Sequence, residues 1–351
     1  MLHEQNSSTP PSIDVKINVA VSCWGKDLTF DLSEHGLIFR RLLTEIGWHL
    51  VSIKDADVDI FLSLEFSQRT LSIVRGKVEK EKRILVQFEP PAVSPGSYTR
   101  STRNKFGKIV VVSPEFLVGP TDEFWRQGFI TDFEKFEPSK AHSVIPGSVG
   151  VLNENKFSLV YRSLYTLRKR ALQTLIENNI SLRIGGKNWD KGFIWTAAKQ
   201  IHAILICLSS GRLPRLGLLR NSFKPIDRSI FVGTVENGLE FLSQHEYALV
   251  IENDERYVSE KIFNALEAGA IPVYVGGALH HWGEINETAI LARPNPQAIL
   301  RAITSVTEAQ KIQLRNAARK YLIDQETRKF IQRDEGLKRL GEILRSYLRT
   351  L

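Results

Sequence analysis

The sequence has little cysteine and no long apolar run. The two cysteines, Cys23 and Cys207, have no metal-like spacing, which argues against zinc or iron–sulfur sites and against a disulfide framework. The most apolar short run, AILICL at 203–208, is far too short to span a bilayer. The first residues, MLHEQNSSTPPSIDVK, lack the apolar core of a signal peptide. We therefore expect a soluble, cytoplasmic protein.

The size and the charge of the chain narrow its class. A chain of 351 residues exceeds the usual size of one hydrophobic core, so two domains are expected. The net charge of +8 is compatible with phosphorylated substrates, nucleic acid or an anionic membrane surface, and charge alone does not choose among them.

The first part of the chain alternates apolar runs with helical spacing. Its predicted elements are strands at 16–24, 57–66, 82–89 and 108–114 and a helix at 37–48. Residues 1–15 are predicted to be disordered. The stretch 117–156 has few periodic patterns and several Gly, Pro and Asp residues, so the junction is placed near its end, with a first domain at 16–155.

The second part repeats this order. Its predicted elements are strands at 157–162, 180–186, 246–253 and 271–276 and helices at 163–179 and 259–268. Residues 187–230 give no clear pattern. We therefore expect a second domain at 156–334, followed by an amphipathic helix at 335–351. Two open α/β domains with a cleft between them follow, and ligands bind such sheets at the C-terminal ends of the strands.

The segment IENDERYVSEKIFNALEAGAIPVYVGG, at 251–277, contains a cation in an unusual place. Ser259 is a plausible N-cap, which puts Lys261 in the first turn, at the positive end of the helix dipole. Free N–H groups and the lysine ammonium would then converge on the loop before the helix, which suits a phosphate. Alternatively, Lys261 lies on a solvated face and is balanced by Glu260 or Glu252.

This segment closely resembles the signature of the α-1,3/1,4-fucosyltransferases, glycosyltransferase family ten. The family pattern is roughly F-E-N, a variable loop, Y-[VI]-[ST]-E-K-[IL], a helix and I-P-V-Y-x-G, and this chain has IEN, YVSEKIF and IPVYVGG. Ile251 stands in place of the usual Phe. The resemblance implies a GT-B-like α/β fold with two Rossmann-like domains facing a central cleft. The absence of the animal enzymes' cysteine pairs and membrane anchor points to a bacterial-type member.

The resemblance also implies roles for individual residues. Glu89, in LVQFEPPAVSPGS at 85–97, matches the family's general base. Arg168, in LRKRALQTL at 167–175, matches the arginine that contacts the donor diphosphate, with Arg170 and Arg162 as near competitors. Lys261 would contact the diphosphate and Glu260 the ribose hydroxyls. Tyr257 and Asn253 would reach phosphate oxygens, and Glu252 is a further candidate.

The implied reaction is an inverting transfer of fucose from GDP-fucose to a hydroxyl of a glycan acceptor, in glycan biosynthesis or protein glycosylation. The expected partners are a nucleotide sugar and a glycan acceptor, and no bound cofactor is expected. A divalent metal is not expected to be essential. The DVD sequence at 57–59 has the spacing of a metal site, but it precedes its strand, and α/β sheets present ligands at the other end.

Two other functions fit parts of the sequence. The first is a glycosyltransferase that uses another nucleotide sugar. The second is a non-enzymatic nucleic-acid-binding protein, but no recognised module supports it, so nucleic acid is not an expected partner. The helix at 335–351 either packs on the body of the protein or makes a peripheral contact with the inner face of the membrane. A lipid-linked acceptor would be found at such a surface.

Overall fold

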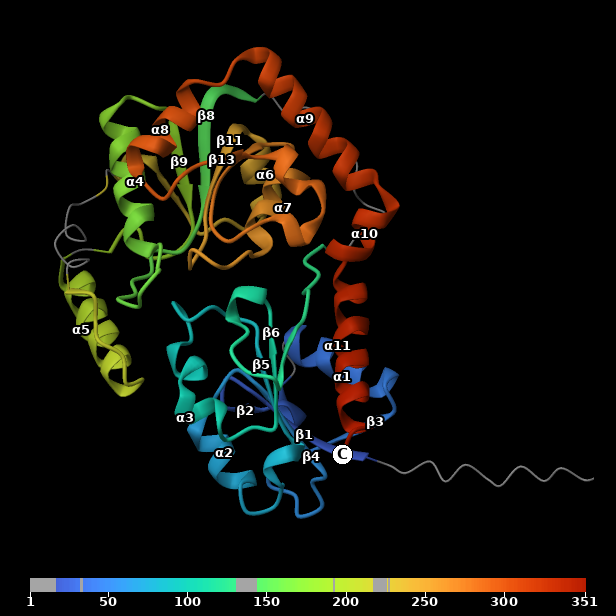
Figure 1. Cartoon of the computed structure of the whole chain (residues 1–351). Helices are drawn as coiled ribbons and strands as arrows, with labels where there is room; N and C mark the ends of the chain where they lie inside the picture. The colour runs from blue at the N-terminus through green and yellow to red at the C-terminus, as the bar shows by residue number, and fades with distance from the viewer. Residues whose placement is uncertain (1–16, 32–33, 131–143, 192, 217–225, 227) are drawn as a thin grey trace, which may run out of the picture.

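The computed structural model describes residues 17–31, 34–130, 144–191, 193–216, 226 and 228–351. The predicted disorder of 1–15 lies outside the described residues. Figure 1 shows two α/β domains, one above the other, each built around its own parallel sheet.

The first domain has seven strands in the order β2-β1-β4-β5-β6-β7, with β3 also pairing with β1. The strands are β1 (Ile17–Cys23), β2 (Lys26–Asp27), β3 (Trp48–Val51), β4 (Ile60–Leu64), β5 (Arg83–Gln87), β6 (Lys108–Val111) and β7 (Asp122–Phe124). Only the short β2 runs antiparallel among these pairings, and Val19 of β1 is in register with Ile60 of β4. The helices are α1 (Glu34–Glu45), α2 (Gln68–Val74) and α3 (Arg100–Arg103). Aliphatic residues of the central strands form the buried core.

The second domain has six parallel strands in the order β10-β9-β8-β11-β12-β13. They are β8 (Ile145–Leu152), β9 (Leu182–Gly185), β10 (Phe231–Gly233), β11 (His245–Ile251), β12 (Ile271–Val275) and β13 (Ile290–Leu291). The helices between them are α4 (Tyr165–Glu177), α5 (Phe193–Ser209), α6 (Gly238–Ser243) and α7 (Glu260–Glu267).

The second sheet begins earlier than the predicted junction near 155. Strand β8, which starts at Ile145, belongs to it, whereas 157–162 contains turns and no strand. The sequence of β8, IPGSVGVL, contains Pro and two Gly residues, which weaken a strand pattern. Packing excludes a larger residue at position 150, because a Cβ on Gly150 would lie 2.5 Å from Cδ2 of His245.

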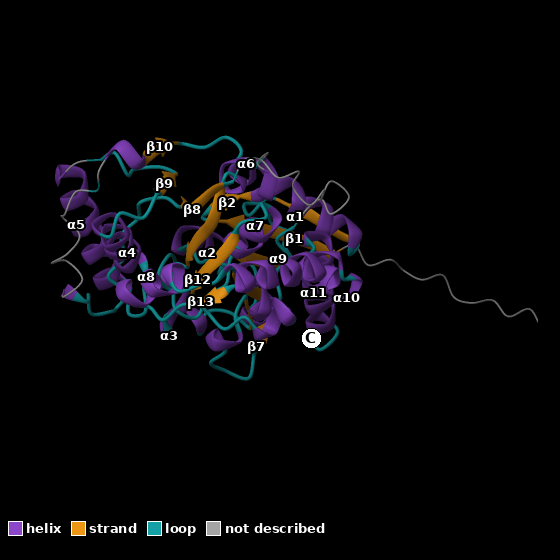
Figure 2. Ribbon diagram, turned by 90° about the horizontal axis from the view of Figure 1, so that it is seen from above, coloured by secondary structure: helices purple, strands orange, loops and turns teal. Residues whose placement is uncertain are grey.

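The stretch without a clear pattern, 187–230, contains α5. This helix stands at the edge of the molecule in both views (Figures 1 and 2). Its inner face packs on Leu159 and Val160 through Ala203 and Cys207.

The last four helices return the chain to the first domain. They are α8 (Pro296–Thr304), α9 (Glu308–Ile323), α10 (Gln325–Ile331) and α11 (Arg333–Leu348), and Figure 1 shows α11 running beside α1. Leu340 and Leu344 of α11 are fully buried in the core of the first domain. The apolar face of 335–351 therefore covers that core, as the first of the two alternatives expected, and this face is not free to contact a bilayer.

The segment around Trp125, at the end of the first domain, meets the start of α11, the helix that returns to this domain. Nε1 of Trp125 donates to the main-chain oxygen of Gly336 at 2.7 Å. Gly128 and Gly336 pack so closely that a Cβ on Gly336 would lie 2.3 Å from the nitrogen of Gly128. Only glycine permits this approach of two backbones.

In the part of the chain that the structure describes, no helix combines the length and apolar character needed to cross a membrane. The cytoplasmic location stays a prediction.

Candidate active site

The first domain presents a carboxylate, Glu89, just after β5. Three hydrogen bonds fix the backbone here. The nitrogen of Glu89 donates to Oε1 of Glu65 at 2.8 Å, and the hydroxyl of Tyr98 donates to the main-chain oxygen of Glu89 at 2.8 Å. The hydroxyl of Tyr257 donates to the main-chain oxygen of Phe88 at 3.1 Å. The last bond crosses from the second domain. The backbone of Glu89 is therefore held at a defined point between the domains.

Glu65 is a second carboxylate at the same edge, and the sequence did not single it out. It follows β4, is fully buried, and has a left-handed backbone with φ of 64°. Its Oε2 accepts from Oγ of Ser97 at 2.6 Å. The only signal in the sequence was a carboxylate at the end of the predicted strand 57–66, the end at which α/β sheets bind ligands.

Both carboxylates have raised pKa values. Burial raises the pKa of Glu89 to about 7; the Glu65 carboxylate adds to the rise, and Lys261 opposes it. Burial also raises the pKa of Glu65 to about 7, against the hydrogen bonds from Ser97 and the nitrogen of Glu89. A carboxylate with a pKa near neutrality is suited to accept a proton at physiological pH.

The second domain presents Lys261 at the start of α7, with Ser259 as the N-cap predicted. Nζ of Lys261 lies 2.8 Å from Oγ of Ser259 and 3.4 Å from Oε2 of Glu252. Glu252 is fully buried and also accepts from the nitrogen of Ser259 at 2.9 Å and from its hydroxyl at 2.7 Å. Glu252 thus lies beneath the lysine and positions it.

Arg168 of α4 is held against the end of β11. Its Nε donates to the oxygen of Ile251 at 2.8 Å, and its Nη2 donates to Oδ1 of Asn253 at 2.7 Å. The guanidinium also lies 4.7 Å from the ring centre of Tyr165, a cation–π contact. Burial lowers the pKa of Arg168. Arg170, one of its competitors in the sequence, is exposed on the same helix.

One cavity of about 190 Å³ brings the predicted residues together. Its lining includes Glu89 from the first domain and, from the second, Arg168, Asn253, Tyr257, Glu260 and Lys261. Asn153, Glu154, Lys156, Tyr165 and Ser259 complete the lining. Glu252 and Arg170 do not line it. The hydroxyl of Tyr257 donates to the main-chain oxygen of Phe88, and Oδ1 of Asn253 accepts from Arg168. That these two residues reach phosphate oxygens stays a prediction.

Two further cavities share residues with this one. A cavity of about 320 Å³ shares Asn153, Glu154, Glu260 and Lys261, and it extends over the second sheet to Gly186 and Thr234. A cavity of about 370 Å³ shares Glu89, Tyr257 and Glu260, and it extends into the first domain. Its remaining lining includes Phe39, Trp125, Phe129 and Leu337. Glu89 thus borders the site on the side of the first domain, and Lys261 borders it on the side of the second.

Asn153, which directly follows β8, is a further residue of the site that was not predicted from the sequence. It lines the central cavity and the cavity over the second sheet, and its side chain is buried. Its Oδ1 has no hydrogen-bond partner among the described residues. An unpaired buried acceptor is costly, which makes Asn153 a candidate to bind a donor group of a ligand. The sequence predicts a strand at 157–162 instead of β8, so it does not place Asn153 at the end of a strand.

No group of three or more His, Cys, Asp or Glu residues within the described ranges is arranged to hold a metal ion. In the DVD sequence, Oδ2 of Asp59 accepts from the nitrogen of Asn18 at 2.8 Å, at the start of β4 and away from Glu65. That a metal is not essential stays a prediction.

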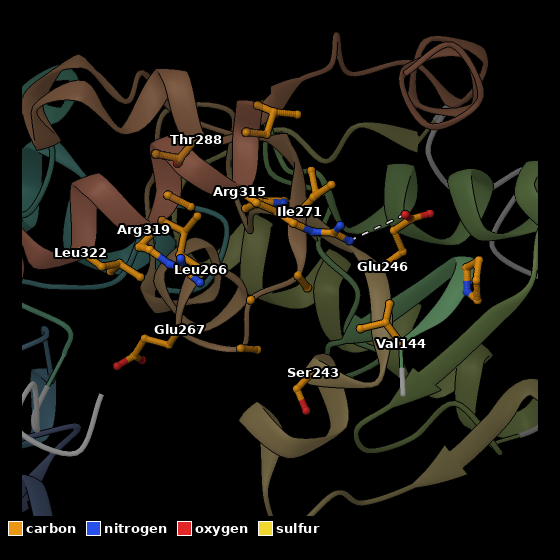
Figure 3. Close-up of a pocket in the computed structure, with 17 residues that line it drawn as sticks. Val144, Ser243, Glu246, Leu266, Glu267, Ile271, Thr288, Arg315, Arg319 and Leu322 are labelled. Carbon is orange, nitrogen blue, oxygen red and sulfur yellow. Dashed lines mark ion pairs between the residues drawn. The ribbon is translucent and has the colours of Figure 1, made fainter. Parts of the chain in front are cut away.

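Another cavity, of about 380 Å³, lies at the opposite edge of the second sheet (Figure 3). It is lined by the end of α7, the start of β12 and residues of α9, among them Glu267, Ile271 and Arg319. Burial raises the pKa of Glu267 to about 7. None of the predicted site residues lines this cavity, because they gather at the C-terminal ends of the strands.

Comparison with known proteins places this site in a wider context. No protein-family model matches the chain. It is 32% identical over 79 residues to alpha-(1,3)-fucosyltransferase B of Drosophila melanogaster, covering 21% of this chain and 18% of the fly protein. It is 36% identical over 59 residues to GDP-fucose protein O-fucosyltransferase 3 of Danio rerio, covering 16% of this chain and 13% of the fish protein. These matches thus span less than a fifth of each curated relative.

Solved structures resemble the whole chain. An α1,3-fucosyltransferase structure matches with a TM-score of 0.51 and 13% identity, over 98% of this chain and 93% of that one. A structure of Anabaena HepE in complex with UDP and glucose matches with a TM-score of 0.52 and 14% identity, over 88% and 89%. The expected GT-B-like fold is confirmed, and so is the resemblance to fucosyltransferases, at low identity.

Proposed function

We propose that the protein is an inverting glycosyltransferase that transfers fucose from GDP-fucose to a hydroxyl group of a glycan acceptor. The observation that carries this proposal is the cavity between the domains. It sets one carboxylate of the first domain, Glu89, against Lys261, Arg168 and the start of α7 in the second. This is the division of charge that a reaction with a base and an anionic leaving group requires.

In the proposed reaction, the acceptor hydroxyl gives its proton to the Glu89 carboxylate. The hydroxyl oxygen forms a bond to the anomeric carbon of the sugar while the bond from that carbon to the diphosphate oxygen breaks. GDP leaves with an added negative charge. Lys261, Arg168 and the N–H groups of the first turn of α7 stabilise that charge, and Glu89 retains the proton.

The three cavities suggest how the substrates are divided. The proposal assigns the diphosphate to the central cavity and the nucleoside to the cavity over the second sheet, where Glu260 and Asn153 offer acceptors for hydroxyl or amino groups. The acceptor is assigned to the cavity of the first domain, with its aromatic lining. A lipid-linked acceptor and a cytoplasmic location remain parts of this proposal.

The fucose donor is the more specific part of the proposal. The sequence match to a fucosyltransferase supports this part of the proposal. The fold alone does not, because a protein solved with UDP shares it. A second candidate is therefore a transferase with the same machinery and another nucleotide sugar.

Thermal unfolding with a panel of nucleotide sugars tests the proposal. We expect GDP-fucose to raise the unfolding temperature, since a ligand at 100 times its Kd adds about 2.7 kcal/mol to stability. Arg168→Ala should lose this protection, whereas Arg170→Ala, on the same helix and outside the cavity, should keep it. Protection by a UDP sugar alone would favour the second candidate. An absence of protection by every nucleotide sugar, with binding of an oligonucleotide, would overturn both.

A further inference from the structure

Helix α5 turns an apolar face toward solvent. Ile194 is 85% exposed, Ile201 60%, Leu205 59% and Leu208 55%. Together with Ala198 these residues recur every three or four positions, so they form one stripe along the helix. Gln200, Ala203 and Cys207 occupy the opposite face and are buried. The orientation is thus the reverse of an ordinary surface helix, which turns its apolar stripe toward the core.

The apolar surface continues beyond the helix. Leu213 is 91% exposed and Leu216 is 57% exposed, and Tyr161 lies nearby with 61% of its surface exposed. The Arg215 guanidinium lies 5.2 Å from the ring centre of Tyr161. We call this set, the α5 stripe with Leu213, Leu216 and Tyr161, the α5 surface. Its size exceeds the scattered single exposures that are normal on a soluble protein.

The charged residues of the segment that contains α5 have one sign, and Asp190 just before it pairs with Lys191. Residues 191–216 contain Lys191, Lys199, Arg212 and Arg215 and neither Asp nor Glu. Lys199 and Arg215 are exposed. An aliphatic stripe flanked by lysine and arginine is typical of a helix that lies in the interface of an anionic bilayer. Protein interfaces are instead enriched in aromatic residues and methionine, and the stripe itself contains only Ile, Leu and Ala.

We propose that the α5 surface docks the protein on an anionic lipid bilayer. The aliphatic side chains enter the boundary between headgroups and acyl chains, and Lys199 and Arg215 lie at the level of the lipid phosphates. The helix stands at the edge of the molecule in both Figures 1 and 2. The proposal does not depend on the reaction proposed above.

Sedimentation with lipid vesicles tests it on the full chain. We expect the protein to sediment with vesicles of phosphatidylcholine and phosphatidylglycerol at low salt, and to do so much less with phosphatidylcholine alone. The double variant Ile201→Ser/Leu205→Ser should reduce the partition coefficient by about tenfold or more, because it removes two aliphatic side chains from the surface. Lys199→Glu/Arg215→Glu should weaken binding to the anionic vesicles and abolish its salt dependence.

The matched control is Ile312→Ser/Ile323→Ser on α9, where the two side chains are 59% and 54% exposed. This variant should bind vesicles like the wild type. Unchanged thermal unfolding of each variant verifies that it is folded. Absence of vesicle binding by the wild type at low salt, or equal loss in the control, would overturn the proposal. A wild-type dimer that becomes monomeric in the α5 variant, without vesicle binding, would show that the surface contacts a second copy.

Discussion

The carboxyl ends of the two sheets face each other across one cavity, yet they carry opposite chemistry. The edge of the first sheet ends in two carboxylates, Glu65 and Glu89, and the main-chain nitrogen of Glu89 donates to Oε1 of Glu65 at 2.8 Å. The edge of the second ends in Arg168 and Lys261, each held by hydrogen bonds from its own domain. The proposed function therefore assigns the proton acceptor to one sheet edge and the anionic leaving group to the other.

The two edges also stabilise their charges differently. Lys261 has a buried counter-charge, Glu252, and a hydroxyl from Ser259. Glu89 has another carboxylate behind it, and its pKa rises to about 7 as a result of burial and of that neighbour. In the proposed reaction, the phosphate-binding lysine is paired with a counter-charge, whereas the base lies in a site that raises its pKa toward neutrality.

Removing the base should have the largest effect. Glu89→Gln preserves the shape of the side chain and loses the proton acceptor, so kcat should fall by about 10²–10⁴-fold. GDP affinity, measured by calorimetry, should change little, because Glu89 belongs to the other edge. Turnover within a few-fold of the wild type would remove Glu89 from the reaction.

Removing the cation should weaken donor binding. Lys261→Ala should raise the Kd for GDP by an amount equivalent to about 1.5–3 kcal/mol, the scale of a hydrogen bond to a charged group. Stability should fall as well, because buried Glu252 loses its cation.

Lys311 provides the matched control for that variant. Its Nζ lies 3.0 Å from buried Glu246, so it makes a similar pair at the other end of the sheet. Lys311→Ala should lower stability and leave the Kd for GDP unchanged. Equal GDP affinities in the two variants would show that Lys261 has only a structural role.

A smaller effect is expected at Asn153. If its unpaired Oδ1 accepts a hydrogen bond from the nucleotide, Asn153→Ala should weaken GDP binding by about 0.5–1.5 kcal/mol. Asn155, two residues along, donates through Nδ2 to the oxygen of Asn188 and does not line the cavity. Asn155→Ala should therefore bind GDP normally, and the difference between the two variants, measured by titration, isolates the contribution of Asn153.

The mildest change alters the neighbour of the base. The base form of Glu89 is depleted below its pKa of about 7, so kcat/KM should fall with decreasing pH below neutrality. Glu65→Gln removes a negative charge that raises this pKa, so the acidic limb of the profile should move to lower pH. Glu79→Gln, at an exposed position of the first domain, should leave the profile in place. An unchanged limb in Glu65→Gln would show that the two carboxylates are not coupled.

The sequence predicted best what is local. The segment from β11 through α7 to β12 contains its own cap, dipole and strand pattern, so the position of Lys261 followed from a few neighbouring residues. The choice of Arg168 over Arg170 required the resemblance, since helical spacing alone does not say which face of α4 meets the second sheet.

The sequence failed where contacts join distant segments. Glu65 matters because its carboxylate meets the nitrogen of Glu89, 24 residues away, and that pairing depends on how β4 and β5 align. Strand β8 was not predicted because its glycines weaken a strand pattern. Tertiary packing explains such a glycine, as at Gly150 against His245. Helix α5 was not predicted because apolar residues lie on both of its faces, Ile201 and Leu205 toward solvent and Ala203 and Cys207 toward the core, so the amphipathic pattern is weak.

The return of α11 to the first domain has a consequence for biosynthesis. Gly341 packs on Leu42 of α1 and on Ile46, just after that helix, and Leu340 and Leu344 complete the core around them. About 300 residues separate these partners, which at ordinary rates of synthesis takes roughly 15–60 s to translate. The first domain to leave the ribosome is thus the last to be completed. Its unfinished core must remain exposed or be shielded until nearly the whole chain has been made.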